Sequence, residues 1–282
     1  MKYSQRPKYE RRNETIAVLV MILLCIPVLF IYFSFFANAF ILDSTGELTL
    51  QNFQFLYQPI QLSQYTVEPI GKAFRNTVIF TAVATTLEVT ISCMAGYALA
   101  RMEFTGKRVI SFSLLTLRLF PGVLLLIGVL YMLLYLGILN TLTGVIVVAS
   151  ALRLPGSTFI IRNFFAGIPQ DIENSALVDG CNRLTAFFQV IIHMVKPGLA
   201  SISIFAFMSA WSNYLLFNVL IFNTKTPVLA TYLRVLSRND QMIADYGVFA
   251  AMAMVYMLPV LIFFFISQRQ LMQGTISGGK GI

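Results

Sequence analysis

One uninterrupted apolar run near the N-terminus limits what this chain can fold into. The run "IAVLVMILLCIPVLFIYFSFFANAFIL", from Ile16 to Leu42, contains no charged residue over 27 positions. As a helix it would be about 40 Å long, which exceeds the roughly 30 Å hydrocarbon core of a bilayer. The apolar core of a cleaved signal peptide is only about 7–15 residues long. The run therefore predicts a retained first transmembrane helix.

The rest of the chain has the same apolar character. Of its 282 residues 57% are hydrophobic and 11% are charged, and the mean hydropathy is +0.77. A soluble domain of this length could not bury so much apolar surface. A transmembrane β-barrel would show alternating segments of about ten residues instead of long unbroken runs. The sequence predicts an all-α polytopic membrane protein with six transmembrane helices, at 16–42, 76–100, 109–135, 143–165, 198–222 and 246–268.

The distribution of basic residues predicts which side of the membrane each segment occupies. Five of them crowd the N-terminus ahead of the first span: Lys2, Arg6, Lys8, Arg11 and Arg12. Cytoplasmic segments of membrane proteins are enriched in Lys and Arg, so this end is expected inside. The segments that would then lie outside hold only five: Lys72, Arg75, Lys225, Arg234 and Arg238. Both termini are therefore expected in the cytoplasm, and binding of nucleic acid is the less favoured interpretation of the basic arm.

This topology divides the chain into five parts. They are a basic cytoplasmic arm (1–15), the first transmembrane helix (16–42), an extracytoplasmic segment (43–70), a transmembrane core (71–268) and a cytoplasmic tail (269–282). Within the core, the longest cytoplasmic loop covers 166–197 and is called the polar loop below. No segment of one half recurs in the other half, which disfavours an inverted-repeat secondary transporter.

The polar loop has the pattern of two helices joined by a turn. In "PQDIENSALVDGCN", Pro169 suits a helix start, and Asp171 and Glu173 fall in the first turn, where the helix dipole favours acids. Gly180 is expected to end this helix, and "RLTAFFQVIIHMV" resumes with apolar residues at helical spacing. Such a short amphipathic helix either docks in a groove of another protein or lies on the lipid surface.

Four segments together resemble one family. "IPQDIENSALVDGCNRLTAFFQVIIHMVKPGL" resembles the EAA loop of ABC importer permeases. "GKAFRNTVIFTA", "DYGVFAAMAMVYMLPVLIFFFISQRQLMQG" and "SGGKG" are similar to the carbohydrate-uptake branch, in particular to its maltose-permease-like second subunit. The resemblance covers nearly the whole chain. It implies the type I importer fold, in the cell membrane of a bacterium or archaeon, with the polar loop as a coupling helix.

The resemblance also implies a function and a set of partners. The chain would be a permease subunit of an ATP-driven importer, forming half of the pathway for a carbohydrate or related solute. Its partners would be a homologous second permease subunit, two ATP-binding subunits and an extracytoplasmic solute-binding protein, all in or on the lipid bilayer. ATP and Mg would be held by the ATP-binding subunits, and this chain would be non-catalytic, with no cofactor or metal of its own. The alternative from the residues alone is an ion-coupled secondary transporter, for which Glu88 is the only acid in the middle of a span.

The resemblance implies which residues couple the loop to the ATPase. They are Asp171, Glu173, Asn174, Ser175, Ala176, Asp179, Gly180 and Arg183. The chain departs from the family pattern at two positions, because Asn174 stands where the family has Glu and His193 stands where it has Pro. Glu173 is the nearest carboxylate to the first position, about 100° around the helix. We therefore expect docking with altered contacts.

The C-terminal stretch "GTISGGKGI" has the glycine and lysine spacing of a phosphate-binding loop. The pattern is formed by Gly274, Gly279 and Lys280. Gly281 follows the lysine, so the hydroxyl that would bind Mg²⁺ is missing. A nucleotide site is therefore disfavoured here.

Candidate substrate contacts are polar side chains within the predicted spans. Charged residues there are functional candidates by default, and these are Glu88, Arg118 and Arg153. They either pair with one another or line a positively charged cavity for an anionic solute, such as an acidic saccharide. Asn213 and Asn218 are further candidates, because amides inside a span seek polar partners. In the outer segment, the resemblance implies that Thr226, Pro227 and Tyr232 face the binding protein.

Overall fold

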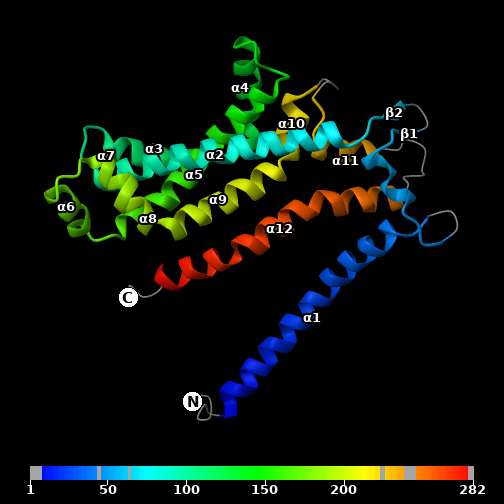
Figure 1. Cartoon of the computed structure of the whole chain (residues 1–282), viewed down its shortest axis with the longest axis horizontal. Coiled ribbons are helices and arrows are strands. Elements are labelled where there is room, and N and C mark those ends of the chain that lie inside the picture. The colour runs from blue at the N-terminus through cyan, green and yellow to red at the C-terminus, as the bar shows by residue number, and fades with distance from the viewer. Residues whose placement is uncertain (1–7, 43–45, 63–64, 223–225, 238–245, 279–282) are drawn as a thin grey trace. The chain divides into compact units, whose positions relative to one another are not determined.

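A computed structural model describes residues 8–42, 46–62, 65–222, 226–237 and 246–278 (Figure 1). The chain divides into two compact units, one made of 1–69 with 235–257 and the other of 70–234 with 258–282. The described residues are mostly helical, and four helices are long and apolar enough to cross a membrane. Two bent helix pairs raise the number to six if each pair is one span. The predicted polytopic helical fold is thereby confirmed.

The first unit contains the N-terminal helix α1 (Lys8–Ala39) and the small segment that follows it. This segment consists of the 3₁₀-helix η1 (Gln51–Leu56) and the antiparallel strands β1 (Ile60–Leu62) and β2 (Tyr65–Val67). The buried Asn52 amide donates hydrogen bonds to the carbonyls of Ala39 (3.2 Å) and Ile41 (2.8 Å) and so fixes the end of α1. Most side chains of α1 are exposed, as expected for a helix whose solvent is lipid or a partner.

The core of the second unit is formed by α2 (Gly71–Arg101), α5 (Leu142–Ala166) and α9 (Lys196–Trp211). These helices run beside one another (Figure 1), and α2 packs most extensively against α5. A Cβ atom at Gly96 would lie 2.5 Å from Ile161 Cγ2, so the close approach of α2 and α5 requires glycine there. Small residues at such crossings are typical of membrane helices.

Two of the predicted spans are interrupted. The span predicted at 109–135 consists of α3 (Lys107–Leu117) and α4 (Gly122–Tyr135), which are bent by 107° across the break at 118–121. The span predicted at 198–222 ends its first helix, α9, at Trp211, and α10 (Tyr214–Leu220) follows. Each of these two predicted spans therefore consists of two helices. Pro121 explains the first break, because proline lacks a backbone N–H and disfavours helical geometry in the residue before it.

The polar loop folds as predicted. α6 (Gln170–Val178) begins after Pro169, carries both acids in its first turn, and ends before Gly180, whose φ is 92°. Asn182 then caps α7 (Arg183–Ala186), which continues through the π-helix η2 (Phe187–Ile191) and α8 (Ile192–Met194). Only glycine adopts such a positive φ without strain, so Gly180 sets the turn between the two helices.

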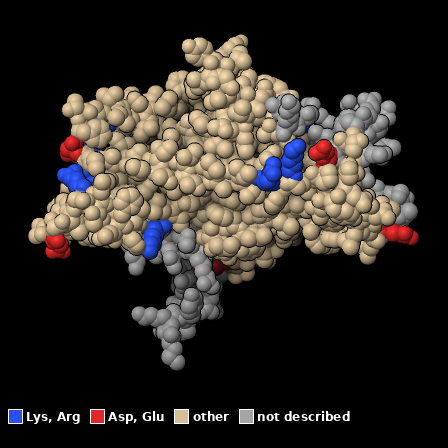
Figure 2. All heavy atoms as spheres, turned by 45° about the horizontal axis from the view of Figure 1, so that its top comes forward, with Lys and Arg blue, Asp and Glu red and all other residues tan. Residues whose placement is uncertain are grey.

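The last two helices are α11 (Leu229–Ser237) and α12 (Tyr246–Gly278). α12 continues past the predicted end of the sixth span at 268, so much of the predicted tail (269–282) is helical. Gly279 and Lys280 of the phosphate-loop pattern lie outside the described residues, as do Lys2 and Arg6 of the basic arm. On the face in Figure 2 charged side chains are few, which suits a surface in contact with lipid.

Candidate functional site

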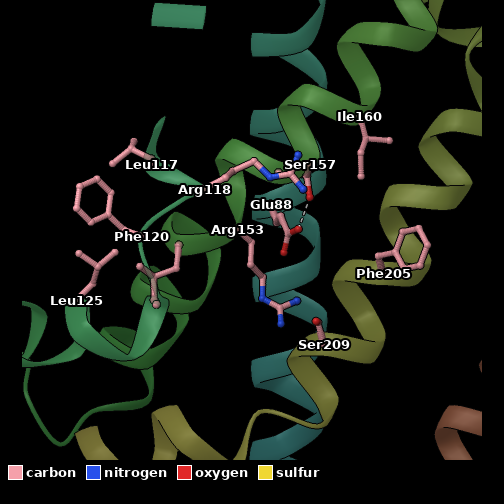
Figure 3. Close-up of a pocket in the computed structure, with 13 residues that line it drawn as sticks. Glu88, Leu117, Arg118, Phe120, Leu125, Arg153, Ser157, Ile160, Phe205 and Ser209 are labelled. Carbon is pink, nitrogen blue, oxygen red and sulfur yellow. Dashed lines mark hydrogen bonds between the residues drawn. The ribbon is translucent and has the colours of Figure 1, made fainter. Parts of the chain in front are cut away.

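A cavity of about 390 Å³ lies in the second unit (Figure 3). Its walls come from α2, α3, α4, α5 and α9 and from the break between α3 and α4. All three charged residues predicted inside the spans line it: Glu88, Arg118 and Arg153. The structure thus brings together side chains from three separate parts of the sequence, and the space they line is called the charged cavity below.

Glu88 is the most deeply placed charge of the cavity. Its side chain is buried on α2, and the hydroxyl of Ser157 donates a hydrogen bond of 2.5 Å to its Oε1. Arg153 lies one turn before Ser157 on α5 and interacts electrostatically with the Glu88 carboxylate. The spacing of four residues explains why both side chains of α5 reach the same space.

Arg118 enters the cavity from the break between α3 and α4. In Figure 3 its side chain runs toward Ser157, whereas the guanidinium group of Arg153 points toward Ser209 on α9. The Arg118 guanidinium carbon lies 5.8 Å from the centre of the Phe159 ring. Within the described part of the chain, no carboxylate oxygen lies within 4.0 Å of either guanidinium group. Two guanidinium groups therefore share the cavity with one carboxylate.

The two asparagines predicted as substrate contacts have local partners and do not line the cavity. Asn213 caps α10, where its Oδ1 accepts a hydrogen bond of 3.3 Å from the backbone N–H of Leu216. Asn218 accepts a hydrogen bond from Arg234 and so joins α10 to α11. Their role in substrate binding stays a prediction.

The outer segment before α11 is held against α2. The backbone carbonyl of Pro227 accepts a 2.9 Å hydrogen bond from the Asn76 amide, and the N–H of Leu229 donates one of 2.9 Å to the hydroxyl of Thr77. Thr226 and Pro227 are half-buried, and Tyr232 is buried. Burial raises the pKa of Tyr232 to about 12. Hydrogen bonds to α2 thus fix this segment to the core where α11 begins.

The polar loop is anchored to the core by a buried carboxylate. Tyr97 on α2 donates a hydrogen bond of 2.7 Å to Glu173 Oε1 on α6. Arg101 Nε lies 3.6 Å from Glu173 Oε2, and Arg101 Nη2 donates to the carbonyl of Ile168 at 2.5 Å. Both charged side chains of this ion pair are almost completely buried. Removing two charges from water costs free energy. A buried ion pair offsets this cost only when its geometry is good and its atoms also make hydrogen bonds.

The other predicted coupling residues mostly face outward. Ala176 is buried, and the exposed ones are Asp171, Asn174, Ser175, Asp179, Gly180 and Arg183. Asn174, at the position of the family's Glu, is among them, whereas its neighbour Glu173 points into the core. His193 is exposed as well. The loop therefore separates a buried anchor from a polar outer face.

The sequence does not indicate the partners of Glu173 or the hydroxyl partner of Glu88. From the sequence, Arg101 is only one of three basic residues, with Lys107 and Arg108, in a short predicted cytoplasmic loop, and no pattern singles out Tyr97 or Ser157. The position of Arg101 could have indicated its role, because it lies at the end of a predicted span, next to a basic loop, where a cytoplasmic carboxylate can reach it. Tyr97 and Ser157 carry no such signal, since hydroxyls are common in spans and only the fold shows which carboxylate they meet.

The helices, the charged cavity and the anchored polar loop define a membrane-embedded transport subunit. Residues 88–276 match the family described as binding-protein-dependent transport system inner membrane component, and the chain belongs to this family.

Relatives of known function extend over most of the chain. It is 32% identical over 271 residues to the diacetylchitobiose uptake system permease protein NgcG of Streptomyces coelicolor, covering 95% of this chain and 87% of the relative. It is 30% identical to the trehalose transport system permease protein SugB of Mycobacterium tuberculosis, covering 83% and 82%. A bacterial ABC transporter involved in the import of the acidic polysaccharide alginate has a similar fold, with a TM-score of 0.78 at 19% identity and coverage of 94% and 98%. The chain is an ABC importer permease subunit, as its sequence predicts, and an ion-coupled transporter is not favoured.

Proposed function

We propose that the chain transports a carbohydrate and forms half of the pathway beside a homologous second permease subunit. Two relatives support this substrate class, because one is a diacetylchitobiose uptake permease and the other a trehalose transport permease. The charged cavity suits such a solute, since Phe120 and Phe205 offer apolar surface and Ser209 offers a hydroxyl group. Ligand pockets commonly combine apolar walls with a few polar groups.

The anchored carboxylate of Glu173 is the observation that carries the coupling proposal. α6 would be the coupling helix, and its exposed polar face would dock in a cleft of a separate ATP-binding subunit. Because Glu173 is bound to Tyr97 and Arg101, a displacement of α6 would also displace α2. α2 carries Glu88 into the charged cavity, so closure of the ATPase would reach the solute site through one continuous helix. Movements of packed, nearly rigid helices are a common form of such switching.

The remaining partners follow from the same assignment. Two ATP-binding subunits would hold ATP and Mg, and this chain would hold no cofactor or metal. An extracytoplasmic solute-binding protein would contact the outer segment around Thr226, Pro227 and Tyr232. Both termini would lie in the cytoplasm.

The proposed function is tested with the assembled importer in liposomes. We expect uptake from a panel of neutral and acidic disaccharides to require both internal MgATP and the binding protein. ATP hydrolysis should be stimulated by the loaded binding protein. Uptake driven by a proton or sodium gradient without ATP would instead favour the ion-coupled transporter.

Coupling is tested by replacing Gly180 with valine. A β-branched residue is strained at its φ of 92°, so the turn after α6 should be distorted and stimulated hydrolysis and uptake should both fall. Gly106→Val is the matched control, because Gly106 has a φ of 90°, open space around it and a position outside the polar loop. Equal effects of the two substitutions would contradict the coupling role.

A further inference from the structure

We propose that the charged cavity binds the carboxylate of an acidic saccharide, with Arg118 and Arg153 as its ligands. This inference rests on the proposed carbohydrate import and names the substrate class. Its basis is the charge of the cavity, because two guanidinium groups meet one carboxylate there. Arginine remains charged in proteins, so the cavity has a positive charge that its own residues do not neutralise.

The excess positive charge of the cavity lies at one arginine, because Glu88 interacts with only one of the two. Oε1 of Glu88 accepts the Ser157 hydroxyl, and the carboxylate interacts electrostatically with Arg153. Arg118 makes its cation–π contact with Phe159 and has no carboxylate within 4.0 Å among the described side chains. A charge inside a membrane span is costly unless a partner compensates it. Arg118 is exposed at the break between α3 and α4, so its guanidinium group is accessible to an anionic ligand that enters the cavity.

The arrangement of the two arginines suits a carboxylate attached to a ring. Arg118 comes from the break between α3 and α4 and Arg153 from α5, so they border the cavity from different elements (Figure 3). A guanidinium group can bind a carboxylate through two parallel hydrogen bonds. The hydroxyl of Ser209 and the ring of Phe205, both on α9, lie on the cavity wall for the neutral part of the sugar. The cavity volume of about 390 Å³ lies in the usual range for small ligands.

Glu88 gives the site a means of release. When the cavity is empty, its carboxylate partly compensates Arg153, and an arriving carboxylate competes for the same guanidinium group. When the ligand leaves, the Glu88 carboxylate again partly compensates the charge of Arg153, which lowers the cost of release. A neutral sugar of the same shape would fill the cavity but leave Arg118 uncompensated, and it should bind more weakly.

The test compares glucuronate with glucose, which share a ring and differ at the carboxylate. The assembled permease and ATPase complex, in nanodiscs and without the binding protein, is titrated with each sugar and followed by saturation-transfer NMR. We expect glucuronate to bind the wild type about tenfold more tightly than glucose, as befits one charge-assisted contact. Equal affinity for the two sugars would overturn the inference.

Three substitutions locate the effect. Arg118→Gln and Arg153→Gln should each remove most of the preference for glucuronate. Glu88→Gln keeps an acceptor for Ser157, removes the competing charge and should strengthen glucuronate binding. Arg108→Gln, an exposed basic residue on α3 outside the cavity, is the control and should bind as the wild type does. A preference that survives both cavity arginine changes, or falls equally in the control, would contradict the proposed site.

The same nanodisc preparations, with the loaded binding protein added in a second measurement, separate this inference from the proposed function. ATP hydrolysis stimulated by the loaded binding protein reports the importer function, and it is measured separately from the affinity of the cavity for glucuronate and glucose. Stimulated hydrolysis together with equal sugar affinities would overturn the acidic-saccharide site alone. Absence of stimulation together with a glucuronate preference that depends on Arg118 would overturn the importer proposal and leave the anion site.

Discussion

At the residue scale, Glu173 connects the polar loop to the membrane core through a single carboxylate. One of its oxygens accepts the Tyr97 hydroxyl, and the other, Oε2, has no hydrogen-bond donor and depends on the charge of Arg101. Removing one member of a buried ion pair leaves an uncompensated charge away from water. Glu173 should therefore matter for both stability and coupling, although Asn174 occupies the family's Glu position.

The first prediction concerns the charge of Glu173. Glu173→Gln should destabilise the complex by about 3 kcal/mol, because Arg101 loses its compensating carboxylate. Stimulated ATP hydrolysis should fall in the same variant, since α6 loses its anchor. Thermal unfolding of the assembled complex and ATPase assays check this. Asn174→Ala, one position along the exposed face of α6, should change stability by less than about 0.5 kcal/mol. Equal losses in both variants would contradict the anchor.

The second prediction separates the hydroxyl of Tyr97 from its ring. Tyr97→Phe removes one hydrogen bond to the carboxylate, worth about 1.5–3 kcal/mol. The ring would keep its contacts with Phe165 (5.6 Å between centroids) and Phe187 (4.7 Å). We expect a smaller loss of stability than for Glu173→Gln, with uptake reduced but measurable. A loss as large as that of Tyr97→Ala would assign the role of Tyr97 to ring packing instead.

At the element scale, the second unit depends on the close contact of α2 and α5. Gly96 lies where these helices meet, next to Ile161 and the backbone of Arg162. The same two helices carry Glu88, Arg153 and Ser157, so their separation sets the geometry of the charged cavity. A change in this helix spacing should therefore affect stability and solute binding together.

The third prediction tests that spacing with two glycine substitutions. Gly96→Ala would place a Cβ atom 2.5 Å from Ile161 Cγ2, and we expect a destabilisation of about 1–3 kcal/mol together with weaker solute binding. Gly128→Ala, on α4, meets open space and should be neutral or slightly stabilising, because alanine favours helix over glycine. Thermal unfolding of both variants gives the comparison. A stable Gly96→Ala protein with normal sugar binding would show that α2 and α5 have room to separate.

Some elements could be predicted from the sequence and others could not, for physical reasons. Long apolar runs identified the spans, and Pro169 with Gly180 identified the helices of the polar loop, because these signals are local. Pro121 permits a kink in the span at 109–135, but the size of the bend, 107°, cannot be predicted from the sequence, since it depends on how α3 and α4 pack. The meeting of Glu88 with Arg153 was one of two open alternatives, and the contact of Tyr97 with Glu173 was not foreseen. Both contacts join residues far apart in the chain, which only the packing of α2 determines.

At the scale of the whole molecule, α2 is the element that every candidate site shares. Thr77 near its start holds the outer segment before α11, Glu88 lines the cavity, and Tyr97 and Arg101 near its end bind the polar loop. Solute binding at the cavity and movement of the polar loop by the ATPase would therefore act on the same unbroken helix. This arrangement requires that the two ends of α2 lie on opposite sides of the membrane.

The fourth prediction tests that orientation by cysteine labelling. Cys181 lies in the polar loop, and Gln58 is an exposed residue of the segment predicted to be extracytoplasmic. With Cys25 and Cys93 replaced by alanine, a membrane-impermeant maleimide should label Cys181 only after the cells are opened. In a Gln58→Cys variant that also lacks Cys181, labelling should occur in intact cells. The physical reason is the cluster formed by Arg101 at the end of α2 and by Lys107 and Arg108 at the start of α3, which favours the cytoplasmic side. Labelling of Cys181 in intact cells would reverse the topology and, with it, the assignment of the polar loop to an ATP-binding partner.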